Sequence, residues 1–395
     1  MNFSFTRNPS TKVGIEINTS GLTQADNELV IIGRRAASGG SATTNVPVQI
    51  ENYGDPVAVA TEVVTRFGSS SEIGAMIIAA VKGVFYSDMV TKKYPTIKAI
   101  AMANDDDETD LAATLAANIG LPMPFVVVPF VATNSTARGA LKTHLTAISA
   151  ADRGDNAQFG SFGFIGSLDT LSNTTTAGEA IASELICVPW LRDGAGSPVN
   201  KVYEVASAYA AVCASNGQPF LPLNGIVIGG LSAPASKSDW HTSGDAGSIS
   251  LGLASGAVPL FVKSDGTIAI SRSVTTYRPS SSAADSYYDM QDWQVLYYYR
   301  KNAYLLSLQP RYKIAKATDQ KLKSLLSELI QLAKDFETLE MFQHVDQLVD
   351  QFSVQRPLDN RHAGVYNIPV NCVPGFHNKG IGVVGTTAFD TFQIA

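Results

Sequence analysis

Residues 105–110 hold a dense group of carboxylates, whose oxygens are suitable ligands for hard cations such as calcium. The group comprises Asp105, Asp106, Asp107, Glu108 and Asp110. A calcium loop of the EF-hand type needs glycine at its sixth position and glutamate at its twelfth. Counted from Asp105, those positions hold Asp110 and Ala116. The pattern therefore favours a solvated helix start, where acidic side chains suit the helix dipole, and we predict no metal site there.

Histidine and cysteine, the usual ligands of transition metals, are scattered along the chain. The five histidines form no HxxxH or HExxH pair, and the three cysteines (Cys187, Cys213 and Cys372) form no CxxC pair. We expect reduced, buried thiols and no zinc site. The GxxxxGK[ST] phosphate loop, a strand–GxGxxG–helix unit and the GxSxG elbow are also absent, so no cofactor is predicted. A serine–histidine arrangement assembled only by folding stays open as an alternative.

Aromatic and basic residues are concentrated between Thr275 and Arg300. The stretch contains Thr275-Thr276-Tyr277-Arg278-Pro279, then Tyr287-Tyr288-Asp289, then Tyr297-Tyr298-Tyr299-Arg300. Such side chains could stack on nucleic-acid bases, but the net charge of −6 argues against a nucleic-acid partner. Two interpretations remain equally open: packing within the chain, and contact with another protein.

The composition indicates a multi-domain protein with an unusually uncharged surface. The chain has 395 residues, of which 45% are hydrophobic and only 16% charged, so we expect two or three cores and self-association. No apolar run reaches 18 residues and residues 1–10 contain no apolar leader segment, so we expect neither a membrane span nor a secretory signal.

The elements that position these residues follow a β–α rhythm through the middle of the chain. Apolar runs without polar alternation predict strands at 29–33, 97–102, 125–128, 162–165 and 185–188. Helices are predicted at 56–67, 72–85, 108–118, 136–150, 177–183 and 202–215. This order predicts a doubly wound, mostly parallel α/β domain over residues 26–250, preceded by a polar arm over residues 1–25.

A different pattern follows residue 250 and predicts a smaller α+β domain over residues 251–375. A hairpin with strands at 258–262 and 267–275 surrounds the Asp265-Gly266 turn. Helices are predicted at 292–306, 318–339 and 340–352, the second with an apolar stripe and a cap at Thr318 or Asp319. Strands are predicted at 367–373 and 381–384, the latter in a C-terminal arm over residues 376–395.

Six motifs in register resemble the contractile tail sheath proteins of the Mu-like phage type. They are Val13–Ser20 (similar to V-Y-V-E-I-x-x-S), Val30–Arg35 (v-L-I-G-x-R), Leu223–Leu231 (PLN…G-L), Gly266–Tyr277 (a dG-x-v-x-I-x-R-x-x-T-T-Y hairpin), Asp285–Asp289 (D-x-x-Y-x-D) and Asp359–Arg361 (D-P-N-R). The opening lacks the usual proline and tyrosine, Ser280–Ser282 replaces a more usual turn, and the C-terminus runs past the usual closing strands.

The resemblance implies a structural protein rather than an enzyme. Subunits of this family stack as six-membered rings around a tail tube, and the sheath contracts to drive the tube through the host envelope. The implied partners are further copies of the chain, the tail tube protein, and baseplate and tail terminator proteins. Neither nucleic acid nor membrane insertion is implied. The implied location is the virion tail, assembled in the host cytoplasm; the sheath of a phage-derived injection device is an alternative.

The resemblance also assigns roles to residues. Val13, Ile15, Ile17, Ile381, Val383 and Val384 would lie in arm strands that add to a neighbour's sheet, with folding back onto their own domain as the alternative. Arg272, Thr275, Thr276, Tyr277, Arg278 and Asp289 would form a motif of the inner, tube-proximal domain. Lys316, Lys321 and Lys323 are candidates for facing an acidic tube, although an ordinary solvated helix face has the same composition.

Overall fold

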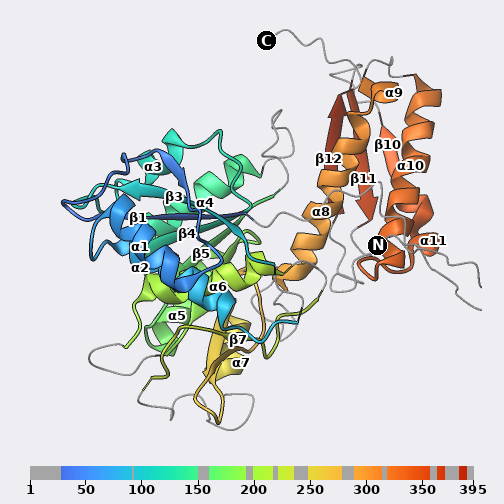
Figure 1. The fold of residues 1–395 in the computed structure, drawn as a ribbon. Helices are drawn as coiled ribbons and strands as arrows, with labels where there is room; N and C mark the ends of the chain where they lie inside the picture. The colour runs from blue at the N-terminus through green and yellow to red at the C-terminus, as the bar shows by residue number, and fades with distance from the viewer. Residues whose placement is uncertain are drawn as a thin grey trace, which may run out of the picture.

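A computed structural model of the chain describes residues 28–90, 93–149, 160–192, 199–216, 221–234, 248–277, 289–313, 318–355, 363–369 and 382–388. These residues form a large part and a small part, which the long helix α8 (Met290–Ser307) joins (Figure 1). The predicted N-terminal arm over residues 1–25 lies outside the described residues.

A nine-stranded sheet organises the large part of the described chain, in the order β2-β3-β1-β4-β5-β6-β8-β9-β7. Strands β3 to β8 of this order pair in parallel, and β2, β9 and β7 join by antiparallel pairing. The strands are β1 (Glu28–Arg34), β2 (Pro47–Gln49), β3 (Thr96–Met102), β4 (Phe125–Val131), β5 (Phe162–Gly166), β6 (Ile186–Trp190), β7 (Val227–Ile228), β8 (Ala257–Val262) and β9 (Ile268–Ile270). The predicted α/β class with a mostly parallel sheet is confirmed.

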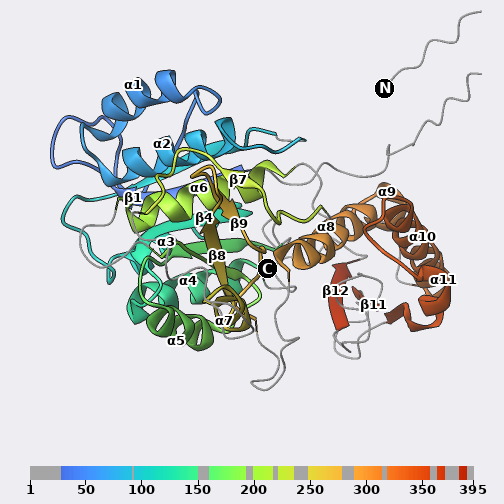
Figure 2. The same ribbon diagram turned by 90° about the horizontal axis from the view of Figure 1, so that it is seen from below.

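Both faces of this sheet are buried, which explains the uninterrupted apolar runs of the strands. In β1, Leu29 and Ile31 join the core on one face, whereas Val30 and Ile32 join the core on the other. Helices α1 (Pro56–Phe67), α2 (Glu72–Phe85) and α6 (Val202–Ser215) cover the first face. Helices α3 (Leu111–Ala117), α4 (Ser135–Ile148) and α5 (Leu171–Ile181) cover the second (Figure 2).

Polar side chains fix where several helices start. Asp55 accepts hydrogen bonds from the backbone N–H groups of Val57 and Ala58 at the start of α1, with Pro56 as the first helical residue. Ser71, Asn134 and Thr170 act in the same way for α2, α4 and α5. Among the described residues, no helix is both long and apolar enough to cross a membrane.

The small part packs helices against a three-stranded antiparallel sheet of order β10-β11-β12. Its elements beyond α8 are α9 (Pro310–Lys313), α10 (Asp319–Thr338), α11 (Val345–Leu348), a 3₁₀ turn (Val349–Gln351), β10 (Ser353–Gln355), β11 (Ala363–Pro369) and β12 (Gly382–Ala388). Thr318 caps α10 through its hydroxyl, which accepts from the Lys321 N–H. The stripe of Leu322, Leu325, Leu329, Ala333 and Phe336 is buried, as its spacing predicts.

The hairpin after residue 250 belongs to the large sheet, which therefore extends past the boundary predicted between residues 250 and 251. Helix α7 (Ser248–Ala254) leads into β8, and β8 pairs in parallel with β6. Strand β9 ends at Ile270 rather than at residue 275, and the next residue, Ser271, still bonds the Pro259 carbonyl of β8 through both its N–H and its hydroxyl. The large sheet therefore includes residues 257–270.

The prediction of a single helix over residues 340–352 is also wrong. Glu340 and His344 adopt left-handed backbone conformations (φ 61° and 57°), and only α11 and the short 3₁₀ turn are helical there. The N–H groups of Met341 and Phe342 bond the Phe336 carbonyl at the end of α10, and both side chains enter the core. Apolar burial thus overrides the helical propensity of this acidic segment.

Candidate functional site

The motif residues Arg272 and Asp289 form the junction at which α8 leaves the large part. The Arg272 Nε lies 2.7 Å from Asp289 Oδ1, and its Nη2 lies 2.9 Å from Oδ2. Val274 and Asp289 pair as an antiparallel bridge, and the Met290 N–H donates to the Ser273 carbonyl. This bidentate, half-buried ion pair therefore holds Asp289, the N-cap residue of α8, beside the segment that follows β9.

Thr275 and Thr276 lie at the same junction and are completely buried. The Thr276 N–H donates to the Ile186 carbonyl at the start of β6. Its hydroxyl donates to the Ser183 carbonyl (2.9 Å) and accepts from the Ser183 N–H (3.0 Å). The threonine pair thus connects the motif to the amino end of the parallel sheet, while Arg278 lies outside the described residues.

The aromatic residues of the motif and of α8 pack within the chain. Tyr277 meets Trp293 edge to face, with the ring centres 5.5 Å apart. Tyr299 is 1% exposed, stacks on Phe342 at 5.0 Å and donates its hydroxyl to the Leu329 carbonyl. These contacts favour the packing interpretation of the aromatic stretch for the residues named here.

The small sheet contains the predicted arm residues Val383 and Val384. Both lie in β12, which pairs along its whole length with β11 of the same chain, placing Val383 opposite Ile368 and Val384 opposite Asn367. In this single chain the C-terminal strand therefore completes its own sheet, and pairing with a neighbouring subunit stays a prediction. Ile381 and the N-terminal residues Val13, Ile15 and Ile17 lie outside the described residues.

Two of the predicted tube-facing lysines lie in the first two turns of α10. Lys321 is half-buried and Lys323 is exposed. No ion pair joins either lysine to the part of the chain that the structure describes. Lys316 lies outside the described residues, and the role of all three stays a prediction.

The acidic run uses its carboxylates within its own turn. Asp106 accepts from the Ala103 N–H, Asp107 from the N–H and hydroxyl of Thr109, and Asp110 from the Asp107 N–H. Across the residues described, no group of three or more histidine, cysteine, aspartate or glutamate side chains could hold a metal ion. The helix itself begins at Leu111 rather than at the predicted residue 108, so the acidic run lies before the helix and not in its first turn.

An ion pair occupies the place where open parallel sheets often bind ligands, the carboxyl ends of strands at which the strand order reverses. Here the order reverses between β1 and β4. Arg34 at the end of β1 binds the Glu72 carboxylate through Nε (2.9 Å) and Nη2 (2.6 Å), and lies over the Phe130 ring. The sequence motifs gave no indication of this pair.

A pocket of about 380 Å³ lies beside that ion pair, at the carboxyl ends of β4 and β5. Its lining combines apolar side chains with a few polar groups: Val131, Thr133, Ser167, Leu168, Asp169, Lys201, Val202 and Tyr203. Asp169 Oδ1 already accepts from the Thr170 N–H and the Asn173 amide. Such a lining resembles that of small-molecule sites, and it is where an enzyme alternative would have to operate.

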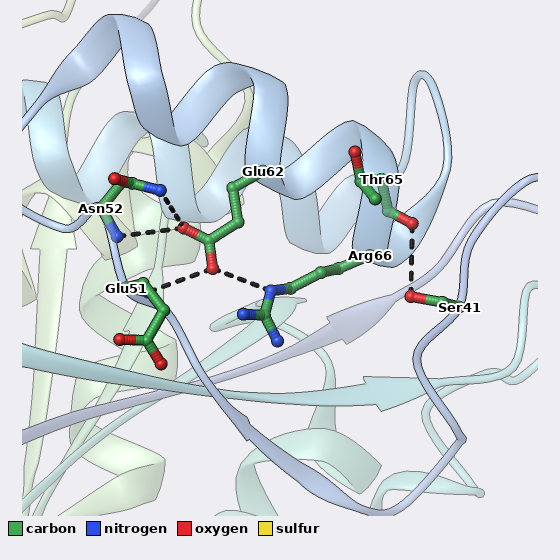
Figure 3. A pocket seen from close by; sticks show the side chains of 6 residues that line it. All are labelled: Ser41, Glu51, Asn52, Glu62, Thr65 and Arg66. Atoms are coloured by element: carbon green, nitrogen blue, oxygen red, sulfur yellow. Dashed lines mark hydrogen bonds and ion pairs between the residues drawn. The ribbon is translucent and has the colours of Figure 1, made fainter.

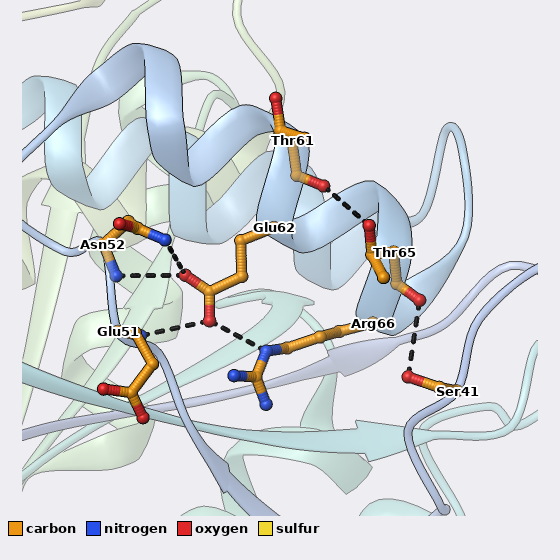
Figure 4. Close-up of polar contacts among 7 residues, drawn as sticks. All are labelled: Ser41, Glu51, Asn52, Thr61, Glu62, Thr65 and Arg66. Carbon is orange, nitrogen blue, oxygen red and sulfur yellow. Dashed lines mark hydrogen bonds and ion pairs between the residues drawn. The ribbon is translucent and has the colours of Figure 1, made fainter.

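A second pocket of about 380 Å³ lies beside α1 and contains a carboxylate with four donors (Figure 3). Glu62 accepts from the Glu51 N–H, the Asn52 N–H and side-chain amide, and the Arg66 Nε at 2.8 Å (Figure 4). Partial burial acts to raise the pKa of Glu62, but the hydrogen bonds outweigh it and hold the pKa below 4.5. Glu62 therefore orders the loop between β2 and α1.

Comparison with solved structures finds proteins of the same fold. A sheath tail protein from Listeria innocua matches with a TM-score of 0.61 at 11% identity, covering 96% of this chain and 98% of that one. A sheath tail protein from Desulfitobacterium hafniense matches with a TM-score of 0.59 at 12% identity, covering 98% and 100%. A chain in the cryo-electron-microscopy structure of the anti-feeding prophage baseplate matches with a TM-score of 0.52 at 12% identity, covering 98% of both chains.

The protein therefore has the fold of sheath tail proteins over nearly its whole length. Comparison of the sequence with models of known protein families finds no match, and comparison with curated proteins finds none either.

Proposed function

We propose that this chain is the structural subunit of a contractile tail sheath of the Mu-like phage type. It polymerises as stacked hexameric rings around a tail tube, and the sheath contracts to drive the tube through the host envelope. The observation that carries the proposal is the whole-length likeness to two sheath tail proteins, which spans both the large sheet and the small part. Six sequence motifs in the order expected for that family support it independently.

The small sheet supports strand exchange between subunits as the means of polymerisation. Strand β10 pairs with only the middle three residues of β11, Val365 to Asn367. This leaves only two residues at each end of β11 on that side, whereas the outer edges of β10 and β12 pair with no other strand among the described residues and could accept a strand from a second chain. The N-terminal segment around Val13–Ile17 is the proposed donor. The proposed partners are further copies of the chain, the tube, the baseplate and the tail terminator, in a virion tail assembled in the host cytoplasm.

Electron microscopy of the purified chain and of matched truncations tests this proposal. We expect tubes or stacked rings from the full chain and folded monomers from a variant lacking residues 1–20. A chain ending at Lys379 loses β12, whereas one ending at Ala388 keeps it, so we expect only the latter to polymerise. Persistent monomers of the full chain, or normal tubes from the variant lacking residues 1–20, would contradict the proposal.

The likeness to a chain of the anti-feeding prophage baseplate structure keeps an injection-device sheath as a second candidate. The pocket at the carboxyl ends of β4 and β5 is the observation that would favour an enzyme instead. A melting temperature that rises with a metabolite, and falls back when Lys201 is replaced by alanine, would support that class. No such dependence is expected of a sheath subunit.

A further inference from the structure

Helix α8 packs on both parts of the molecule, within one continuous hydrophobic core. Its first half packs on the large part, where Met290 is fully buried and Trp293 meets Tyr277. Its second half packs on the small part, where Tyr298 and Tyr299 contact Phe336 of α10 at 5.3 and 5.2 Å between ring centres. Both views show the helix running from one part into the other (Figures 1 and 2). The angle between the parts is therefore set where α8 leaves the large part.

At this point the side chain of Tyr297 packs closely against the large part. Its ring meets Phe162 of β5 edge to face at 5.7 Å. It also lies directly against Gly160, where an added Cβ would come within 2.3 Å of the ring. Gly160 has φ of +94°, a conformation that side chains disfavour, so the position is suited to glycine on both counts.

Arg300 follows Tyr297 by one helical turn and reaches the end of α4. Its Nη2 donates to the carbonyl of Ser149, 3.1 Å away and 151 residues earlier in the chain. Ser149 is the C-cap of α4, where unpaired carbonyls and the helix dipole favour a cation. The guanidinium also lies over the Tyr297 ring at 4.9 Å. The contact thus joins α8 to the far face of the large sheet.

The same guanidinium borders the small part. Arg300 is only 7% exposed, and its charge acts on the buried Tyr366 of β11. Burial lowers the pKa of Arg300, and the arginine still remains charged at neutral pH. A buried cation that donates a hydrogen bond to the end of α4 and lies over an aromatic ring has few alternative positions of equal energy, because moving it costs both interactions.

We propose that Arg300 is a positioning residue that fixes the orientation of the small part relative to the large part. With Arg300 seated on Ser149 and Tyr297, α8 cannot pivot and the two parts move as one rigid body. A force applied to the small sheet is then transmitted directly to the large sheet, because no flexible joint lies between them. This inference concerns the single chain and holds whether or not the chain forms a sheath.

Spin-label distance measurements on the dilute monomer test the inference. Labels at Thr61→Cys on α1 and Ser327→Cys on α10 occupy exposed positions in the two parts, and Cys372→Ser removes the cysteine outside the described residues. We expect one narrow distance peak for the otherwise wild-type chain. Arg300→Met should raise the population outside that peak by about tenfold, the equilibrium effect of one lost charge-assisted hydrogen bond.

Arg311→Met is the matched control, since Arg311 pairs with Glu328 inside the small part and also lies over a tyrosine ring. We expect it to leave the peak unchanged. Gly160→Ala, whose added methyl group would displace the Tyr297 ring, should broaden the peak as Arg300→Met does. A broad wild-type distribution would overturn the inference even if Arg300→Met failed to fold. A folded Arg300→Met protein with the wild-type distribution would overturn it as well.

Discussion

Thr276 uses both its backbone N–H and its hydroxyl to hold the junction segment against the sheet. All three of its hydrogen bonds go to residues of the segment 183–186, about ninety positions earlier in the chain. The side chain is 0% exposed, so water is not available to replace a lost partner. The threonine of the T-T-Y motif is thus explained by hydrogen bonding within the monomer.

We predict that Thr276→Val lowers the free energy of unfolding by about 1–3 kcal/mol, because the buried Ser183 N–H loses its acceptor. Urea denaturation would measure the loss. Thr267→Val is the matched control, since the Thr267 hydroxyl binds the exposed Asp265 and its loss is replaced by water. Equal effects of the two substitutions would show that the motif threonine has no special structural role.

The hydrogen bonds of a second single residue, Glu62, can be tested through the pH dependence of stability. Its pKa is lowered in the folded chain, so the ionised form contributes stability above the unfolded value of 4.5. That contribution disappears as the pH falls through the lower, folded pKa. We therefore predict that Glu62→Gln is less stable than wild type at pH 7 and that the difference vanishes well below pH 4.5. A difference that persists at the lowest pH would contradict the assigned hydrogen bonds.

The close approach of α2 and α6 is the clearest example of an element positioned by small residues. Gly83 of α2 faces Ala208 of α6, and an added Cβ would lie 2.9 Å from the Ala208 carbonyl oxygen and 3.0 Å from its Cα. Both contacts are with backbone atoms, which cannot move without shifting the helix. The two helices cover the same face of the sheet, so this spacing sets how closely they pack beside each other in that layer.

We predict that Gly83→Ala lowers the free energy of unfolding by about 1–3 kcal/mol through overpacking. Gly139→Ala in α4 is the matched control, because an added Cβ there meets nothing within 4 Å. That substitution should raise stability by about 0.5–1 kcal/mol, the usual gain of alanine over glycine in a helix. Thermal or urea unfolding of both variants would check the opposite signs.

Over the whole molecule, each of the two parts has its own sheet, and helix α8 connects the parts. The nine-stranded sheet has cores on both faces, and the core of the first face continues into the small part, where it includes Phe336 and Phe342. Among the described residues, β12 pairs with β11 at one edge of the short sheet and with no strand of the large one.

We predict that a chain ending at Lys379 keeps the large sheet folded, whereas the β11 backbone of the small sheet becomes exposed to solvent. Hydrogen exchange should be faster at the β11 amides of this truncation than in the full chain, and unchanged in β1. A chain ending at Ala388 should match the full chain at both strands. Faster exchange throughout β1 in the shorter truncation would instead show that the two parts unfold together.

The local pattern of the sequence determined those elements in which buried apolar residues recur at a short, regular spacing. The strand expected at 29–33 is β1 over Glu28–Arg34, and the helix expected at 202–215 is α6 with the same bounds. The stripe of leucines in α10 is buried as its 3.6-residue period predicts. Periodicity is sufficient here because each element presents a continuous apolar face to one or two neighbouring layers.

Only the tertiary structure decided the features that depend on partners distant in the chain. It added β8 and β9 to the large sheet, replaced the helix predicted over residues 340–352 by α11 and a 3₁₀ turn, and paired β12 with β11 of its own chain. It also brought Arg300 to Ser149 and Arg34 to Glu72. These contacts join residues of unrelated local pattern, and their free energy comes from burial and hydrogen bonds that exist only once the layers have packed.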